Sequence, residues 1–422
     1  MNFRKVLGNK QFVRLWIAQF VSFFGDFIAI YAVYAAITFR MHGSASQVSG
    51  IMIAFLAPFA LMGPLAGVFV DRWNVKRTMI ASDLARALLC LGLIVAATPW
   101  HIYAILFSLS AVSTFFMPAQ SVTLPLLVDR EDLLSAGALM QQTIQIVRIL
   151  SPAAAAALVG LAGEQSCYWI DSASYVASAL LLMTLAIHRP VVPVAVKTVK
   201  GVLSDLGSGF KFILTHPSIS FVIISLTVGM FATGCFTALL AVYVRDVLHE
   251  GTKTFGLLGS LIGIGTMSGG IAVMKFKDRS RAHMVSLGMF LMGGFIGAMA
   301  FAGSTIATFA CTFGLGLGVA FILIPSMTLL QEATPNEMRG RVTSTSTSMF
   351  TLSQGIALLI SGALAARLGI VPIFYASAVI LILVGVVGWW KLSSIEKPAA
   401  APVDPIMAKE AIAGAEGSAE IS

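Results

Sequence analysis

Charged residues are scarce in this sequence. Only 11% of its 422 residues are Asp, Glu, Lys or Arg, whereas 58% are hydrophobic. A soluble domain carries roughly 25% charged residues, so this chain has too few to cover its outside in water. The composition therefore excludes a soluble protein and indicates that much of the molecular surface faces lipid.

Cysteine is rare, and the motifs of common active sites are missing. Cys90, Cys167, Cys235 and Cys311 stand alone in apolar stretches, which argues against disulfides and metal sites and favours packing. No phosphate-binding glycine loop, Ser-His-Asp set or metal-ligand spacing occurs. We therefore predict neither an enzyme nor an ATP-driven pump, and no cofactor.

Long apolar segments are what the sequence has in abundance. A membrane-spanning helix needs about 20 mainly apolar residues. Twelve segments qualify, near 13–38, 47–70, 78–98, 102–127, 138–163, 167–187, 218–245, 254–275, 284–302, 305–330, 342–366 and 371–391. The sequence therefore predicts an all-α integral membrane protein with twelve transmembrane helices.

The distribution of positive charge predicts the orientation. Lys and Arg concentrate in the cytoplasmic loops of membrane proteins. With the N-terminus inside, 21 of the 27 Lys and Arg residues fall in cytoplasmic segments. We therefore expect both termini in the cytoplasm and a multi-pass protein of a bacterial inner membrane. The net charge of +8 is interpreted as topology and contact with anionic lipid, not as nucleic-acid binding.

The two halves of the sequence share one register. At an offset of 207 residues, Gly63 aligns with Gly270, Asp71-Arg72 with Asp278-Arg279 and Pro118 with Pro325. Parallel six-helix repeats are an architecture of secondary transporters. The predicted organisation is a cytoplasmic N-terminal segment 1–12, a six-helix bundle 13–187, a cytoplasmic linker 188–216, a second bundle 217–391 and a disordered cytoplasmic tail 392–422.

The most distinctive local motif lies between the second and third segments. It contains two glycines four residues apart, a carboxylate at the end of the helix and several basic residues. Close packing through the glycines and ion pairs at the loop could latch the two halves together. The predicted latch residues are Gly63, Gly67, Asp71, Arg72, Lys76 and Arg77, supported by an ion pair between Asp83 and Arg86.

This motif resembles the signature loop of the major facilitator superfamily, Gly-x-x-x-Asp-Arg-x-Gly-Arg-Arg/Lys. Here Asn74 replaces the second glycine, and the basic pair is displaced by one residue. Asn9–Gln19 with Gly25-Asp26, the stretch from Pro118 to Pro125, and Glu337–Arg341 are similar to the macrolide-efflux branch, which also contains siderophore exporters. The resemblance implies two pseudo-symmetric six-helix bundles and export of amphipathic small molecules, usually driven by protons.

Asp26 is the clearest candidate for proton coupling. Ionisable groups inside a membrane are costly, so each is a functional candidate. Gln19, Ser22 and Asp26 follow helical spacing and are expected to face a central cavity. A carboxylate in such a cavity can exchange protons near neutral pH. The alternative is a structural Asp that caps a kink near Gly25.

Arg148 is the predicted counter-charge of Asp26. It shares a helix face with Gln141 and Gln145, and these three residues are cavity or substrate candidates. Arg148 could pair with Asp26, bind an anionic group of a substrate or bond to backbone carbonyls. Asp171 is expected in the first turn of the sixth segment, as a cap or first-turn carboxylate or as a proton carrier.

The leading functional hypothesis is a proton-coupled exporter of hydrophobic or amphipathic small molecules that works by alternating access. The alternatives are a siderophore or other metabolite exporter, a lysophospholipid flippase and a sensor that does not transport. The expected partners are a small-molecule substrate, protons and membrane lipid, and a monomer is the expected state.

Overall fold

The computed structural model describes residues 3–187, 199–276 and 280–392. Fourteen α-helices dominate these residues. The first seven are α1 Phe3–Gly8, α2 Lys10–Ala35, α3 Ala45–Arg72, α4 Val75–Gly92, α5 Pro99–Leu127, α6 Leu133–Ala162 and α7 Glu164–Met183. The others are α8 Val199–Thr215, α9 Pro217–Asp246, α10 Thr252–Lys275, α11 Arg281–Ala302, α12 Thr305–Ala333, α13 Asn336–Leu368 and α14 Ile370–Leu392.

The prediction of an all-α membrane fold is confirmed. Eleven helices of the described residues are long and apolar enough to cross a membrane. The predicted sixth segment is α7, which has 20 residues and packs against α2 and α4. It is not among these eleven helices, and it contains two acidic residues, Glu164 and Asp171. It also begins earlier than predicted, so Asp171 lies in its interior and not in its first turn.

Side-chain caps explain where several helices begin. The Asn9 side chain accepts hydrogen bonds from the backbone N–H groups of Gln11 and Phe12, at 3.0 and 3.2 Å. This cap starts α2 at Lys10, three residues before the predicted start. Asn74 likewise accepts from the Arg77 N–H at 3.1 Å and caps α4. Asparagine is among the best N-cap residues, which gives a physical reason for Asn74 in place of the motif's usual glycine.

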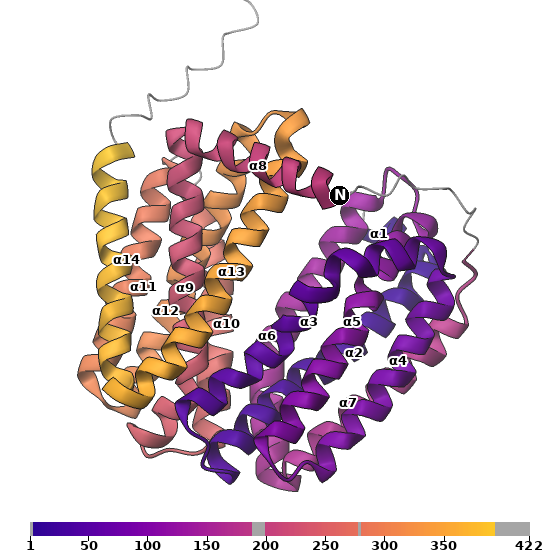
Figure 1. Ribbon diagram of the computed structural model, residues 1–422, viewed down its shortest axis with the longest axis horizontal. Coiled ribbons are helices and arrows are strands. Elements are labelled where there is room, and N and C mark those ends of the chain that lie inside the picture. The colour runs from indigo at the N-terminus through magenta and orange to yellow at the C-terminus, as the bar shows by residue number, and fades with distance from the viewer. Residues whose placement is uncertain (1–2, 188–198, 277–279, 393–422) are drawn as a thin grey trace, which may run out of the picture.

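The long helices form two groups (Figure 1). Helices α2–α7 lie on one side and α9–α14 on the other. Packing between the groups is mainly that of α6 on α10 and α3 on α13. We call the end that carries α1 and α8 the near end, and the opposite end, with the α2–α3 and α13–α14 connections, the far end. The groups approach each other at the far end and diverge toward the near end.

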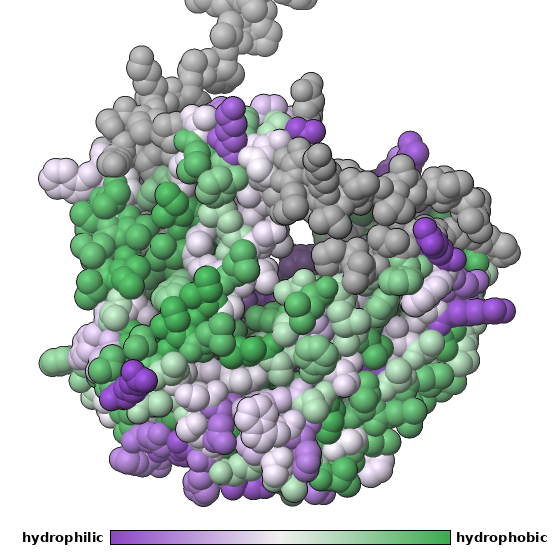
Figure 2. All heavy atoms as spheres, in the orientation of Figure 1, coloured by the Kyte–Doolittle hydropathy of each residue, from purple (hydrophilic) through white to green (hydrophobic). Residues whose placement is uncertain are grey.

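Direct hydrogen bonds join the two groups at the far end. Arg245 of α9 donates from Nη1 to the carbonyl oxygens of Thr38 and Gly43, at 2.7 and 2.8 Å. Ser46 of α3 donates to the carbonyl of Gly362 in α13, at 2.8 Å. These contacts close the far end, whereas Figure 2 shows a hollow between the groups toward the near end.

Glycines of α10 allow it to lie close against α6. A Cβ at Gly256 would come within 2.4 Å of the Ala156 Cβ and 2.5 Å of the Pro152 carbonyl oxygen. Such distances cannot occur without movement of backbone. The Ser260 hydroxyl accepts a hydrogen bond from the Ala153 N–H in the same contact, at 3.1 Å.

We expect Gly256→Val to open the far end, because its side chain cannot fit against α6. The measurement is labelling of Ser260→Cys by a membrane-impermeant maleimide, in a protein whose four native cysteines are replaced. Labelling should rise several-fold with Gly256→Val. It should stay unchanged with the matched control Gly294→Val, where a Cβ meets open space. Equal labelling in both variants would contradict the far-end contact.

The surface between the two ends is apolar. Leu352, in the middle of α13, and Met267, within α10, are 64% and 60% exposed, and green apolar residues cover the flanks of the molecule (Figure 2). Exposed side chains of this size would be unfavourable in water and suit a lipid environment. The protein is therefore a multi-pass membrane protein.

The connecting segments differ in part from the prediction. The predicted linker contains helix α8, which packs on α13, so its described part is ordered helix. At the near end, Lys5 of α1 pairs with Asp132 at 2.7 Å, and this hydrogen bond raises the pKa of Lys5. Residues 188–198, the repeat partners Asp278 and Arg279, and nearly all of the predicted tail lie outside the described residues.

Candidate functional site

Asp, Glu, Lys and Arg residues in the interiors of the membrane helices are confined to one group of helices. Asp26, Asp83, Arg86, Arg148 and Asp171 lie in the interiors of α2, α4, α6 and α7. The corresponding stretches of the second half, 219–244, 254–274, 282–331, 342–366 and 368–390, contain no Asp, Glu, Lys or Arg. Charge inside the membrane therefore belongs to the first half of the chain, although the two halves share one architecture.

Asp26 belongs to a polar cluster between α2, α4 and α7. The Tyr175 hydroxyl of α7 donates a hydrogen bond to its carboxylate. Arg86 of α4 acts electrostatically on Asp26, and its guanidinium lies 4.4 Å from the centroids of both the Tyr175 and the Phe116 ring. Arg86 also forms an ion pair with Asp83, one turn earlier on α4. We call Asp26, Asp83, Arg86, Asp171 and Tyr175 the buried cluster.

Asp171 completes this cluster from α7. Its carboxylate accepts hydrogen bonds from the Cys90 thiol at 3.2 Å and the Ser174 hydroxyl at 3.4 Å. Gly25 lets α2 approach α7 here, because a Cβ at that position would lie 2.5 Å from a carboxylate oxygen of Asp171. Gly25, the residue before Asp26, therefore permits the close contact between α2 and α7.

One predicted pairing is found in the structure and another is not. Asp83 and Arg86 form the predicted ion pair, but they are only 0% and 4% exposed, and Arg86 lies over the Tyr175 ring inside the helix group. Their support of the loop latch stays a prediction. Arg148 was the expected counter-charge of Asp26. The cation that acts on Asp26 is Arg86, whereas Arg148 lies 5.8 Å from the centroid of the Phe27 ring. The pairing was predicted from the expected depth of both residues in the membrane, but the two residues have different neighbours in the structure.

The remaining cavity candidates separate into buried and exposed residues. Gln19 and Ser22 are 1% and 2% exposed, so they pack between helices and do not line a cavity in this conformation. Gln141 and Arg148 are exposed, and Gln145 is partly exposed. The α6 candidates are therefore accessible, while those of α2 other than Asp26 are not.

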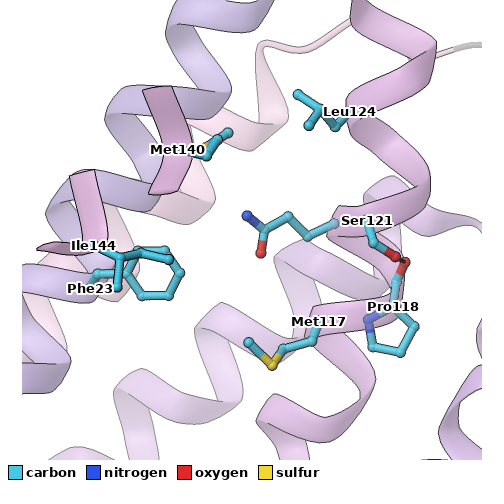
Figure 3. A pocket seen from close by; sticks show the side chains of 8 residues that line it. Phe23, Met117, Pro118, Ser121, Leu124, Met140 and Ile144 are labelled. Carbon is cyan, nitrogen blue, oxygen red and sulfur yellow. Dashed lines mark hydrogen bonds between the residues drawn. The ribbon is translucent and has the colours of Figure 1, made fainter. Parts of the chain in front are cut away.

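A cavity of about 560 Å³ lies between α2, α5 and α6. Its lining is Phe23, Met117, Pro118, Gln120, Ser121, Leu124, Met140 and Ile144. Phe23, Met140 and Ile144 stand on one side and Met117, Ser121 and Leu124 on the other (Figure 3). Its size falls within the range of about 300–1,000 Å³ found for small-molecule sites. This pocket is not apparent from the sequence, because its residues resemble ordinary apolar helix positions.

The signature loop makes a different contact from the one expected. Lys76 donates from Nζ to the carbonyl oxygens of Met183 and Leu185, both at 2.7 Å, and so caps the end of α7. Arg72 and Arg77 are exposed. A Cβ at Gly63 would meet open space, so the close packing predicted there is absent. The surroundings of Gly67 and of the Asp71 side chain lie outside the structure's description, and the latch stays a prediction.

The fold and site define a polytopic α-helical membrane protein whose two helix groups flank a central hollow. The Major Facilitator Superfamily model matches residues 15–282 and 252–414, and the chain belongs to that family of transporters. The predicted resemblance to this family is thereby confirmed.

Known relatives agree with the predicted branch. The chain is 26% identical over 390 residues to macrolide efflux protein A of Streptococcus pyogenes, covering 89% of this chain and 95% of the relative. It is 24% identical over 396 residues to the enterobactin exporter EntS of Shigella boydii, covering 92% of each. The crystal structure of the nucleoside transporter NupG superimposes with a TM-score of 0.73 at 14% identity, over 90% of this chain and all of NupG. The last likeness shows the fold alone.

Proposed function

We propose that this protein is a secondary exporter that couples outward movement of a hydrophobic or amphipathic small molecule to inward movement of protons. The observation that carries the coupling is the exposure of Asp26. Asp83 and Asp171 are 0% and 2% exposed, whereas Asp26 is partly exposed. Of the three carboxylates in the interiors of the described membrane helices, Asp26 is thus the one that a proton from outside the cluster can reach.

The neighbours of Asp26 suit a group that changes its charge. When ionised, Asp26 accepts the Tyr175 hydrogen bond and is attracted by Arg86. When Asp26 is protonated, Arg86 remains paired with Asp83. The buried cation therefore keeps a counter-charge. Loading and unloading the proton therefore changes the charge of the buried cluster without breaking its ion pair.

Alternating access would follow from rocking of the bundles 13–187 and 217–391. In the structure the far end is closed by the Arg245 and Ser46 hydrogen bonds, and the helix groups diverge at the near end. With the basic near end in the cytoplasm, this is the state that loads substrate from inside. Closing the near end would need the far-end contacts to break, and the 188–216 connection would carry the movement.

A siderophore or similar anionic metabolite is the second candidate substrate. EntS, a relative at 24% identity, is an enterobactin exporter. Arg148 is an exposed cation within a membrane helix and makes no ion pair or hydrogen bond in the described residues. Such a group is costly without a partner and suits an anionic substrate.

Accumulation in an efflux-deficient bacterial host tests the proposal. Macrolides, cationic dyes, siderophores and lysolipids would be compared in cells with and without the protein. We expect lower accumulation of particular compounds, and we expect a protonophore to abolish the difference. Equal accumulation of every compound in both cell types would contradict export.

A further inference from the structure

The 560 Å³ cavity offers an apolar site with almost no polar lining. Six of its eight lining residues are apolar, and the other two are Gln120 and Ser121. The Ser121 hydroxyl already donates to the Pro118 carbonyl at 2.8 Å. No charged side chain lines the cavity. It therefore suits the apolar body of a ligand and provides little for a highly polar one.

Arg148 lies directly beyond one end of this cavity. Helices α2 and α6 both run from the near end to the far end, and Phe23 and Ile144 line the cavity from them. One turn further along each helix are Phe27 and Arg148, whose guanidinium lies 5.8 Å from the Phe27 ring. Four residues correspond to about 6 Å of rise, and the Cα–Cβ bonds of a helix tilt toward its N-terminus. The Arg148 side chain therefore starts about one turn beyond Ile144, and its Cα–Cβ bond is directed toward the cavity.

The charges around Arg148 leave it available to a ligand. Asp83 is paired with Arg86, Asp171 bonds Cys90 and Ser174, and Asp26 bonds Tyr175. The transmembrane interiors of the second helix group contribute no carboxylate, because they contain no Asp or Glu. The neighbours shown for Arg148 are the Phe27 ring and Tyr31, which acts on it electrostatically. A cation in this position lacks an anion, and an arginine binds carboxylate or phosphate through two parallel hydrogen bonds.

We propose that the cavity and Arg148 together bind an amphiphile with one anionic group, a carboxylate or a phosphate. The apolar body lies among Phe23, Met117, Met140 and Ile144, and the anionic group reaches Arg148. The two methionines give the wall an adaptable shape, so chain length and ring content can vary while the charge is selected. This inference rests on the proposed transport function and narrows its substrate class, because it favours anionic amphiphiles over cationic drugs.

Binding of three fluorescent probes with one apolar body tests the proposal. The probes are dansylamino-undecanoic acid, its uncharged methyl ester and the corresponding cationic amine. The full-length protein would be placed in phosphatidylcholine nanodiscs, with empty nanodiscs subtracted. We expect the acid to bind at least about tenfold more tightly than the ester or the amine, as for one charge-assisted hydrogen-bonded pair.

Four variants separate the charge from the cavity. Arg148→Gln should weaken binding of the acid by about tenfold or more and leave the ester unchanged, and Arg148→Lys should restore most of the loss. Met140→Trp should weaken both probes by filling the cavity. Arg367→Gln, the same change at an exposed site of α13, should alter neither. Equal binding of all three probes, or full binding of the acid to Arg148→Gln, would overturn the proposal.

Competition distinguishes the two sources of such an anion. Lauroyl-lysophosphatidylglycerol presents a phosphate from the bilayer, and N-octanoyl-glycine presents a carboxylate from water. Displacement of the probe by the lysolipid assigns the site to membrane amphiphiles, and displacement by the acylated amino acid alone assigns it to soluble metabolites. If neither displaces the probe, the proposal fails. Selective binding without any effect on cellular accumulation would instead disprove export and leave the site standing.

Discussion

Cells that express Asp26→Asn should accumulate the exported compounds to the level of cells without the protein. Asparagine keeps the size of the side chain and can still accept the Tyr175 hydrogen bond, but it cannot bind and release a proton. The change therefore removes the proposed proton carrier while leaving the helix contact with α7 in place. The measurement is the intracellular level of these compounds in energised cells, with and without a protonophore. The variant and the original protein are compared at matched amounts in the membrane.

A matched control separates coupling from general damage. Asp129→Asn makes the same chemical change at the near end, where the Asp129 side chain is 82% exposed, and it should export normally. Asp26→Glu should retain part of the activity because it keeps a titratable group. Normal export by Asp26→Asn, with a retained response to the protonophore, would place the coupling elsewhere.

The second large effect is expected on stability. Arg86→Gln removes the cation that pairs with Asp83 and lies between the rings of Phe116 and Tyr175. Breaking a buried ion pair from one side costs about 3–5 kcal/mol, because the other charge remains buried without its partner. We expect the melting temperature of the purified protein in detergent to fall on the order of 10 °C.

The double variant Asp83→Asn with Arg86→Gln provides the control for this prediction. It removes both charges, so most of the lost stability should return, although export should stay impaired because Arg86 no longer acts on Asp26. A double variant as unstable as Arg86→Gln would show that the aromatic contacts of Arg86, and not its ion pair, stabilise the helix group.

The sequence predicted those parts of the fold that depend on local chemistry. Membrane helices follow from runs of apolar residues, and the start of α2 follows from the cap at Asn9. Helix α8 was missed, although Val199, Val202, Leu203 and Leu206 recur at helical spacing within the predicted linker. That pattern was a usable signal, and the polar composition around it concealed the helix.

The pairing of residues from different helices could not be predicted in the same way. Asp26 and Arg148 lie within membrane helices, but depth does not show which helix lies beside which. The structure places Arg86 of α4 and Tyr175 of α7 beside Asp26, whereas Arg148 of α6 lies over the Phe27 ring. Asp171 and Tyr175, one turn apart on α7, were the available signal for this cluster.

Burial was also poorly predicted from helical spacing. Gln19 and Ser22 share a face with Asp26 by periodicity, yet both are buried because α2 packs closely against α7. Gly63 shows the opposite error, since a glycine expected to mediate close packing has open space beside it. Both errors arise because a helix face has neighbours only once the tertiary arrangement is known.

Proton movement in proteoliposomes tests the central claim most directly. The purified protein would be reconstituted with a pH-sensitive dye in the lumen, and an exported compound would be added to one side in the absence of any other ion gradient. We predict a change of luminal pH that requires the compound and is lost in Asp26→Asn. Transport of the compound with no accompanying pH change would contradict proton coupling at Asp26.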